Sequence, residues 1–186
     1  MPQGKASRVW VIMGVCGCGK STVGTGLAEK LGCEYIEADT YHSDANVAKM
    51  RSGQPLTDDD RWPWLDSLAA RIKQSRERNE DLVVGCSALK VAYRHRLSGG
   101  ELTYTSEASP IVFLWLKVSE EVLKRRMDAR KDHFMPSSLI KSQFATLEVD
   151  QYIVPMDSER DGAEVVKEAF QFAQQLDERT VISSRL

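Results

Sequence analysis

The segment from Gly14 to Ser21 carries the clearest chemistry in the chain. It reads Gly-Val-Cys-Gly-Cys-Gly-Lys-Ser and fits the pattern G-x-x-x-x-G-K-[ST] in full. Glycines let such a segment curl until several backbone N–H groups point at one phosphate. The Lys20 ammonium can then reach the β- and γ-phosphates, and the Ser21 hydroxyl can bind Mg²⁺. The expected nucleotide ligands are the loop glycines and the residues that begin the following helix: Gly14, Gly17, Gly19, Lys20, Ser21 and Thr22.

A carboxylate follows the second strand that we expect along the chain. Asp39 would lie at the carboxyl edge of a parallel sheet, which is also the edge that the phosphate loop occupies. There it could orient an acceptor hydroxyl and take its proton, a role that contributes about 10²–10⁴ in rate. Glu37 could help hold the water shell of a metal ion. The alternative is that Asp39 only caps a helix or faces solvent in a turn.

Two groups of basic side chains could bind anionic parts of the reactants. One lies in and before a break in the helical pattern: Arg125, Arg126, Arg130, Lys131 and His133. It predicts a mobile lid over about residues 130–137 that brings positive charge to the phosphates and excludes water. The alternative is an exposed helix end that the helix dipole favours. The other group could recognise an anionic acceptor such as a carboxylate: Arg61, Lys90 and Arg94. Judged alone, each of these three is more often a surface charge.

The elements that would position these residues alternate between strands and helices. Short apolar runs predict strands at residues 8–13, 34–38, 81–86, 111–118 and 152–156. Helical spacing and capping predict helices at residues 20–31, 45–50, 58–76, 90–97, 119–130, 137–147 and 161–176. Pro155 restricts the last strand to the edge of a sheet or to a strand end. The pattern predicts the α/β, three-layer P-loop NTPase fold, a parallel sheet with helices on both faces and a mobile lid.

Composition narrows the class of protein further. The 186 residues fit one domain, residues 1–186, in which about residues 40–77 form a helical region for the acceptor. With 25 basic and 27 acidic side chains the net charge is −2, which argues against a general nucleic-acid or membrane-surface binder. The longest apolar runs are far too short to cross a bilayer. Four cysteines are too few for a disulfide framework, so we expect a cytoplasmic protein, with a short organelle signal left open.

The chain lacks the N-K-x-D sequence with which switch GTPases recognise guanine, and it also lacks D-x-x-G. Its length and single domain favour a small-molecule kinase that uses ATP and Mg²⁺. The acceptor could be a sugar acid, or another small molecule such as shikimate or a nucleotide. A non-catalytic nucleotide-binding module is the alternative from another class. The intact Lys20, Ser21 and Asp39 argue against that last alternative.

Several segments between about residues 9 and 150 follow one another in a characteristic order. They are the phosphate loop, Ala38-Asp39 with Tyr41-His42, Lys49-Met50, Gly53-Gln-Pro-Leu-Thr-Asp-Asp-Asp-Arg61 with Pro63-Trp64-Leu65, Cys86-Ser-Ala-Leu-Lys90 with Tyr93-Arg94, His133-Phe-Met-Pro136, and Gln143-Phe144 with Thr146-Leu147-Glu148. Together they resemble the gluconokinase family, small P-loop carbohydrate kinases related to shikimate and adenylate kinases. The phosphate loop is generic, whereas the blocks at 53–61 and 86–90 are more specific.

The resemblance implies transfer of the ATP γ-phosphate to the 6-hydroxyl of D-gluconate, giving 6-phospho-D-gluconate and ADP. It places Asp39 at the acceptor and Arg61 on the gluconate carboxylate, a planar anion that a guanidinium fork suits. Arg126 would lie over the adenine or the phosphates, and Arg130 would act from the lid. The weaker substrate candidates are His42, Lys90, Arg94, His133 and Gln143. Members of the family are often dimeric, so the resemblance implies a possible homodimer.

The sequence departs from the family at three places, one of which is near Tyr93-Arg94, where Val91 and His95 replace a usual lysine and aspartate. Cys16 and Cys18 stand in the phosphate loop where serines are usual. A thiol at a helix N-terminus can have a lowered pKa and be oxidisable, which is a hypothesis for this pair. Asp132 stands in the expected lid where a glycine commonly precedes the histidine. These departures concern affinity and the lid rather than the class of reaction.

Overall fold

The computed structural model describes residues 7–100, 102, 109–128 and 137–183. The strands are β1 (Val9–Met13), β2 (Glu34–Glu37), β3 (Leu82–Gly85), β4 (Ile111–Lys117) and β5 (Ile153–Asp157). The helices are α1 (Lys20–Leu31), α2 (Asp44–Arg51), α3 (Asp58–Glu77), α4 (Val91–Leu97), α5 (Glu120–Asp128), α6 (Ser137–Thr146) and α7 (Gly162–Ser183), with a 3₁₀ turn η1 (Ala38–Tyr41). Within the described residues no helix is long and apolar enough to span a membrane.

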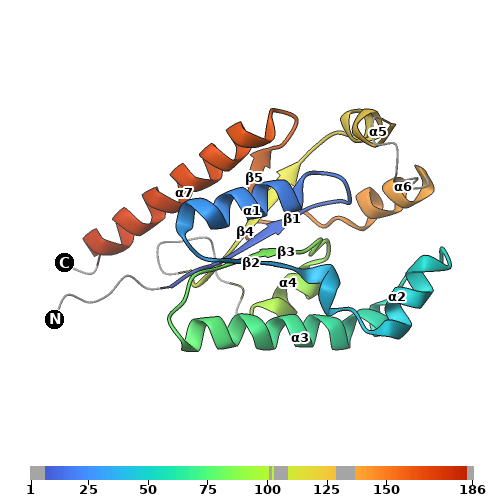
Figure 1. Ribbon diagram of the computed structural model, residues 1–186, viewed down its shortest axis with the longest axis horizontal. Coiled ribbons are helices and arrows are strands. Elements are labelled where there is room, and N and C mark those ends of the chain that lie inside the picture. The colour runs from blue at the N-terminus through green and yellow to red at the C-terminus, as the bar shows by residue number, and fades with distance from the viewer. Residues whose placement is uncertain (1–6, 101, 103–108, 129–136, 184–186) are drawn as a thin grey trace.

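The strands of the described chain form one parallel sheet in the order β2-β3-β1-β4-β5. Helices α1 and α7 pack together on one face, and α3 and α4 pack together on the other (Figure 1). This arrangement confirms the predicted three-layer α/β fold. Because all the strands run in one direction, their carboxyl ends meet at a single edge, and the connections that leave that edge can share one site.

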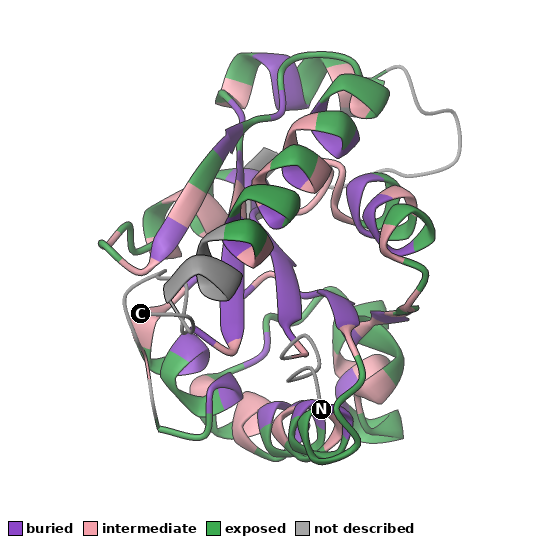
Figure 2. Cartoon of the chain, turned by 90° about the vertical axis from the view of Figure 1, so that its left-hand side faces the viewer, coloured by how far each residue is buried: buried purple, intermediate pink, exposed green. Residues whose placement is uncertain are grey.

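The central strands of the sheet are buried between its two helical layers, as the burial colouring in Figure 2 shows. Every residue of β1 is 1% exposed or less. Trp10 and Ile12 join the core beneath α1 and α7, whereas Val9, Val11 and Met13 join the core beneath α3 and α4. A strand covered on both faces needs apolar residues at every position, which explains the continuous apolar run in the sequence. The central strand therefore gives the loop that follows it a rigid base.

The structure differs from the expected elements mainly at their ends. Helix α7 continues to Ser183 rather than ending near Leu176. The turn η1 was not expected, because four residues give too short a pattern to detect. Strand β5 pairs only with β4 among the described strands, so Pro155 lies on an edge strand as predicted. The expected lid falls on residues 130–136, which lie outside the described residues, and on Ser137, which begins α6.

Candidate active site

The phosphate loop connects the central strand to α1 and is curled by three glycines with positive φ. The φ angles are 142° at Gly14, 81° at Gly17 and 106° at Gly19, values that residues other than glycine rarely adopt. The Lys20 ammonium donates to the carbonyl oxygens of Gly14 at 3.3 Å and Val15 at 3.1 Å, so the lysine folds back over the loop. Helix α1 begins at Lys20, and its positive dipole end faces the same space.

A pair of oxygen donors lies beside this loop. The Ser21 hydroxyl, on the first turn of α1, donates to Glu37 Oε2 at 2.7 Å. Glu37 is the last residue of β2, so the carboxyl end of that strand comes directly to the phosphate loop. A hydroxyl and a carboxylate are hard oxygen ligands of the kind that Mg²⁺ takes, directly or through its water shell. The residues present therefore fit a magnesium ion that accompanies the nucleotide.

Asp39 lies on the turn η1, two residues after Glu37, and its side chain is exposed. Glu37 brings the carboxyl end of β2 to the phosphate loop through Ser21, and Asp39 follows directly. Burial raises the pKa of the Cys86 thiol, just past the end of β3, to about 12, while Lys20 lowers it and both Asp39 and Glu37 raise it. Asp39 therefore lies at the carboxyl edge of the sheet, the edge that the phosphate loop occupies, and its role at the acceptor stays a prediction.

The expected acceptor residues His42 and Arg61 lie near Asp39. The His42 ring stacks on Trp64 with a centroid distance of 4.3 Å, and the Trp64 indole donates to the carbonyl oxygen of Ala38 at 2.7 Å. Burial lowers the pKa of His42, the Asp39 carboxylate opposes that shift, and the Arg61 charge adds to it. Asp39 and Arg61 are thus each within electrostatic reach of His42.

Arg61 is held at the beginning of α3. Its Nη1 donates to the carbonyl oxygen of Leu56 at 2.6 Å, and its guanidinium lies 5.8 Å from the centre of the Tyr93 ring. These contacts orient the guanidinium toward the end of α3 that faces the site. This position is compatible with binding of the acceptor carboxylate by Arg61, which stays a prediction.

Lys90 makes a salt bridge rather than presenting a separate charge to an acceptor. Its ammonium contacts both Asp58 carboxylate oxygens, at 2.7 and 2.9 Å, and the Tyr93 hydroxyl donates to the same carboxylate. Asp58 belongs to α3, whereas Lys90 and Tyr93 belong to the start of α4. In this structure Lys90 ties two helices together.

Arg94 requires a correction. We expected Arg94, like Arg61 and Lys90, to present its charge to an anionic acceptor, but the Arg94 side chain is fully buried. Its Nη atoms donate to the Asp150 carboxylate at 2.8 Å and to three carbonyl oxygens, those of Ala88, Leu89 and Glu148. Ala88 has a φ of 42°, a strained value for a residue with a side chain. Arg94 therefore holds the connection after β3 in shape.

Gln143 reaches the phosphate loop itself. Its Oε1 accepts a hydrogen bond from the backbone N–H of Cys16 at 2.6 Å, which brings α6 against the loop.

Arg126, on α5, donates to the carbonyl oxygens of Ser158 at 2.6 Å and Arg160 at 3.3 Å. The Ser158 hydroxyl in turn donates to the carbonyl oxygen of Cys18, so the β5–α7 connection is joined to the phosphate loop.

The remaining candidates are placed as follows. Thr22 is exposed on the first turn of α1, whereas Arg130 and His133 lie outside the described residues. Cys18 is buried, and this burial raises its pKa, so the expectation of a reactive thiolate is wrong for that residue. Its side chain packs into the core beneath the loop instead. Cys16 is partly exposed.

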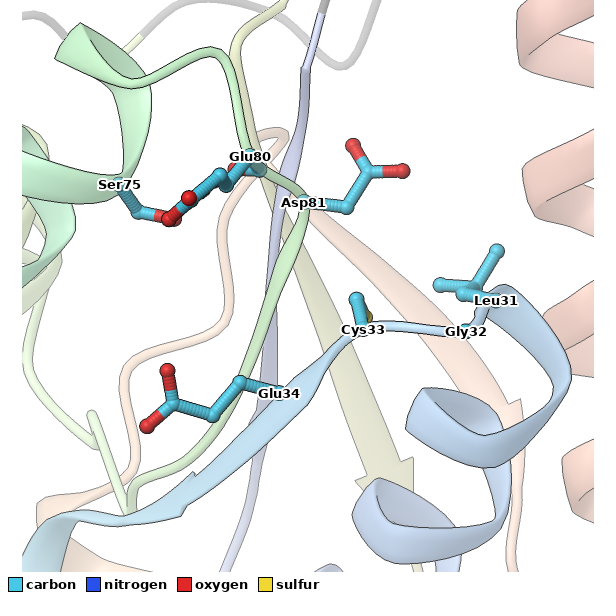
Figure 3. Close-up of a pocket in the computed structure, with 7 residues that line it drawn as sticks. All are labelled: Leu31, Gly32, Cys33, Glu34, Ser75, Glu80 and Asp81. Carbon is cyan, nitrogen blue, oxygen red and sulfur yellow. Dashed lines mark hydrogen bonds between the residues drawn. The ribbon is translucent and has the colours of Figure 1, made fainter.

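A cavity of about 340 Å³ lies at the other edge of the sheet and is separate from this site. Figure 3 shows its lining, which comes from the end of α1, the last turns of α3 and the amino ends of β2 and β3: Leu31, Gly32, Cys33, Glu34, Ser75, Glu80 and Asp81. Helix α1 has 12 residues and is therefore about 18 Å long, which separates the two places. The cavity has no part in the chemistry described above.

Sequence reasoning missed several residues that shape the site. Tyr35 donates its hydroxyl to Glu37 Oε2 at 2.6 Å, and Trp64 supports His42. Asp58 partners Lys90. Trp64 and Asp58 do lie in the segments that carry the family resemblance, which was a usable signal. Tyr35 gave none, because an aromatic residue in a strand is ordinarily read as core.

Together these observations define the class of the protein. A parallel sheet whose central strand leads into a phosphate loop, with the carboxylates that follow β2 at the same edge, is the architecture of a P-loop kinase. Residues 9–149 match the family model described as an AAA domain, so the chain belongs to that family. More narrowly, its similarity to gluconokinases over most of its length makes the chain a member of the gluconokinase family.

The individual similarities are extensive. The chain is 42% identical to the gluconokinase of Gluconobacter oxydans over 89% of this chain and 90% of that protein. It is 39% identical to the thermosensitive gluconokinase of Escherichia coli over 89% of this chain and 87% of that protein. The crystal structure of a gluconokinase from Sinorhizobium meliloti matches with a TM-score of 0.82 at 40% identity, over 98% of this chain and 99% of the other. The crystal structure of shikimate kinase from Aquifex aeolicus shares the fold alone. It matches with a TM-score of 0.54 at 14% identity, over 90% of this chain and 96% of the other.

Proposed function

We propose that this protein phosphorylates the 6-hydroxyl of D-gluconate with ATP. The observation that carries the proposal is the contact of Ser21 in the phosphate loop with Glu37 at the carboxyl end of β2, with Asp39 two residues further on. His42 lies beside this turn, stacked on Trp64, whose indole donates to the carbonyl oxygen of Ala38. Similarity to gluconokinases over most of the chain supports this acceptor over shikimate or a nucleotide.

In the proposed reaction Asp39 orients the 6-hydroxyl and accepts its proton as the oxygen attacks the γ-phosphorus. The Arg61 guanidinium binds the carboxylate at the other end of the gluconate chain and thereby fixes which hydroxyl reaches the phosphate. The Lys20 ammonium stabilises the negative charge on the transferring phosphoryl group. Arg126 supports the nucleotide side through the β5–α7 connection, and Gln143 holds the loop from α6.

Ser21 and Glu37 would hold the magnesium ion, directly or through its water shell. When bound, that ion neutralises charge on the β- and γ-phosphates and orients them for transfer. The Ser21 hydroxyl has one proton, and donating it to Glu37 leaves the oxygen lone pairs available for the metal.

The test is a coupled ADP-release assay with a panel of acceptors: D-gluconate, other aldonic acids, shikimate and a nucleoside monophosphate. We expect turnover with gluconate, and we expect Lys20→Ala to abolish it. Turnover of another acceptor without gluconate would reject the proposed substrate. Nucleotide binding without any turnover would favour a non-catalytic module instead.

Three further expectations stay predictions. They are the lid near residues 130–137 with Arg130 and His133 acting from it, the homodimer, and the cytoplasmic location. The division into one domain with an acceptor region at about residues 40–77 is also part of the proposal. It is supported by the position of η1, α2 and the start of α3 beside Asp39.

A further inference from the structure

Tyr35 carries a polar contact that the proposed reaction does not use. We infer that the Tyr35 hydroxyl is a positioning group for the metal-binding pair, holding Glu37 so that Ser21 and Glu37 present their free oxygen lone pairs to the divalent cation of the nucleotide. The inference rests on the proposed function, because it concerns the metal that accompanies ATP. It adds a residue from the middle of β2 that touches neither substrate.

Two hydroxyls donate to one carboxylate oxygen. Tyr35 donates to Glu37 Oε2 at 2.6 Å, and Ser21 donates to the same atom at 2.7 Å. An oxygen that accepts two hydrogen bonds from different directions fixes the rotamer of its carboxylate. Its partner oxygen keeps its lone pairs for a metal-bound water. Groups that orient metal ligands in this way typically change metal affinity when they are removed.

Two glycines, one in α1 and one in β3, leave the space that the Tyr35 ring occupies. A Cβ at Gly24, inside α1, would lie 2.3 Å from Tyr35 Cε2. A Cβ at Gly85, at the end of β3, would lie 2.3 Å from the Tyr35 hydroxyl oxygen. Glycine inside a helix is destabilising relative to alanine, and Gly24 therefore needs a structural reason. The close approach of the ring supplies that reason, because only glycine leaves the space.

The direction of this contact follows from the groups involved. A carboxylate only accepts, so the Tyr35 hydroxyl is the donor to Glu37 Oε2.

The experiment compares ADP binding with and without Mg²⁺ by calorimetry in the wild type, Tyr35→Phe and Tyr35→Leu. Tyr35→Phe keeps the ring and removes the hydroxyl. We expect it to leave metal-free ADP affinity unchanged and to reduce the gain in affinity caused by Mg²⁺ about threefold to tenfold, the size of one hydrogen bond. Tyr35→Leu should show the same loss of metal dependence and in addition a lower melting temperature, because the ring packing is lost.

A double-mutant cycle tests whether Tyr35 acts on metal binding through Glu37. In a Glu37→Gln background, Tyr35→Phe should cause no further loss of the Mg²⁺-dependent gain. The inference is overturned if Tyr35→Phe binds Mg²⁺ and ADP as the wild type does, if the two substitutions are additive, or if wild-type affinity for ADP is independent of Mg²⁺. None of these measurements requires gluconate, so failure of the proposed acceptor in the turnover assay would be seen separately.

Discussion

Asp39 is an exposed carboxylate on a short turn, and its exposure suits a group that must meet a diffusing acceptor. Asp39→Asn keeps the size of the side chain and removes the base. We expect ADP affinity to stay within about twofold and kcat to fall at least about a hundredfold, the usual size of a general-base contribution. Steady-state kinetics with gluconate would measure this. Asp44→Asn, an exposed neighbour on α2, is the matched control. A near-normal kcat in Asp39→Asn would reassign the base.

Arg61 is expected to act on binding rather than on the chemical step. Arg61→Ala should raise KM for gluconate about tenfold to a hundredfold, because a charged hydrogen bond is worth about 1.5–3 kcal/mol. The KM for ATP should change little. Arg51→Ala, which removes an exposed arginine from α2, serves as the control. If KM for gluconate is unaffected by Arg61→Ala, carboxylate recognition belongs to another residue.

At the scale of elements, Arg94 joins α4, the connection after β3 and the segment after α6. Arg94→Ala would leave the Asp150 carboxylate without its buried partner, and such losses cost about 3–5 kcal/mol. We expect a clear fall in the free energy of unfolding, measured by urea denaturation. Arg96→Ala, which breaks an exposed pair with Asp66, should change it little. A stable Arg94→Ala protein with only a raised KM would restore the substrate role that the sequence suggested.

The stability of the start of α3 should depend on pH, because Asp60 is a titrating member of its capping box. Its carboxylate closes a capping box with Thr57 and accepts from Lys49. The Lys49 ammonium, followed by Thr57, lowers the pKa of Asp60 to about 2. Because the folded pKa lies below the unfolded value, this stabilisation is complete above about pH 4 and is lost as the pH falls toward 2.

Thermal melts between pH 7 and pH 2 would measure that dependence. Asp60→Asn should melt below the wild type at neutral pH, and the gap should close as the pH approaches 2. Asp59→Asn, a change at the exposed neighbour, should run parallel to the wild type throughout. A gap that stays constant with pH would show that the capping contact is not titrating.

How much the sequence predicted differs between elements for physical reasons. The buried strand β1 and helix α1 were predicted almost to the residue, because continuous apolar character and a glycine-rich turn have few other solutions. Arg94 was misjudged because a charge at helical spacing looks the same whether its partners are water or buried carbonyl groups. Tyr35 was not predicted, because its hydroxyl finds Glu37 only once Gly24 and Gly85 have brought three elements together.

For the whole molecule, nucleotide binding should couple to stability. At a free concentration of 100 times Kd, a ligand that binds only the folded state adds about 2.7 kcal/mol. For a chain of this size that amounts to a rise in Tm of about 5–10 °C. We expect this rise with a non-hydrolysable ATP analogue and Mg²⁺, measured by differential scanning fluorimetry. In Lys20→Ala most of it should disappear, whereas an undiminished rise would place the nucleotide elsewhere.

Strand β1 lies between two halves of the sheet that lead to different partners in the proposed reaction. The strands on one side, β2 and β3, lead into η1, α3 and the start of α4, whereas β4 and β5 lead to Arg126 and the connection that contains Ser158. The two sets of connections meet at the loop above the central strand, and Arg94 joins them again through Asp150 and Glu148. Substitutions after β2 and β3 should therefore alter acceptor binding first, whereas the contacts on the phosphate donor come from the loop that both sides share.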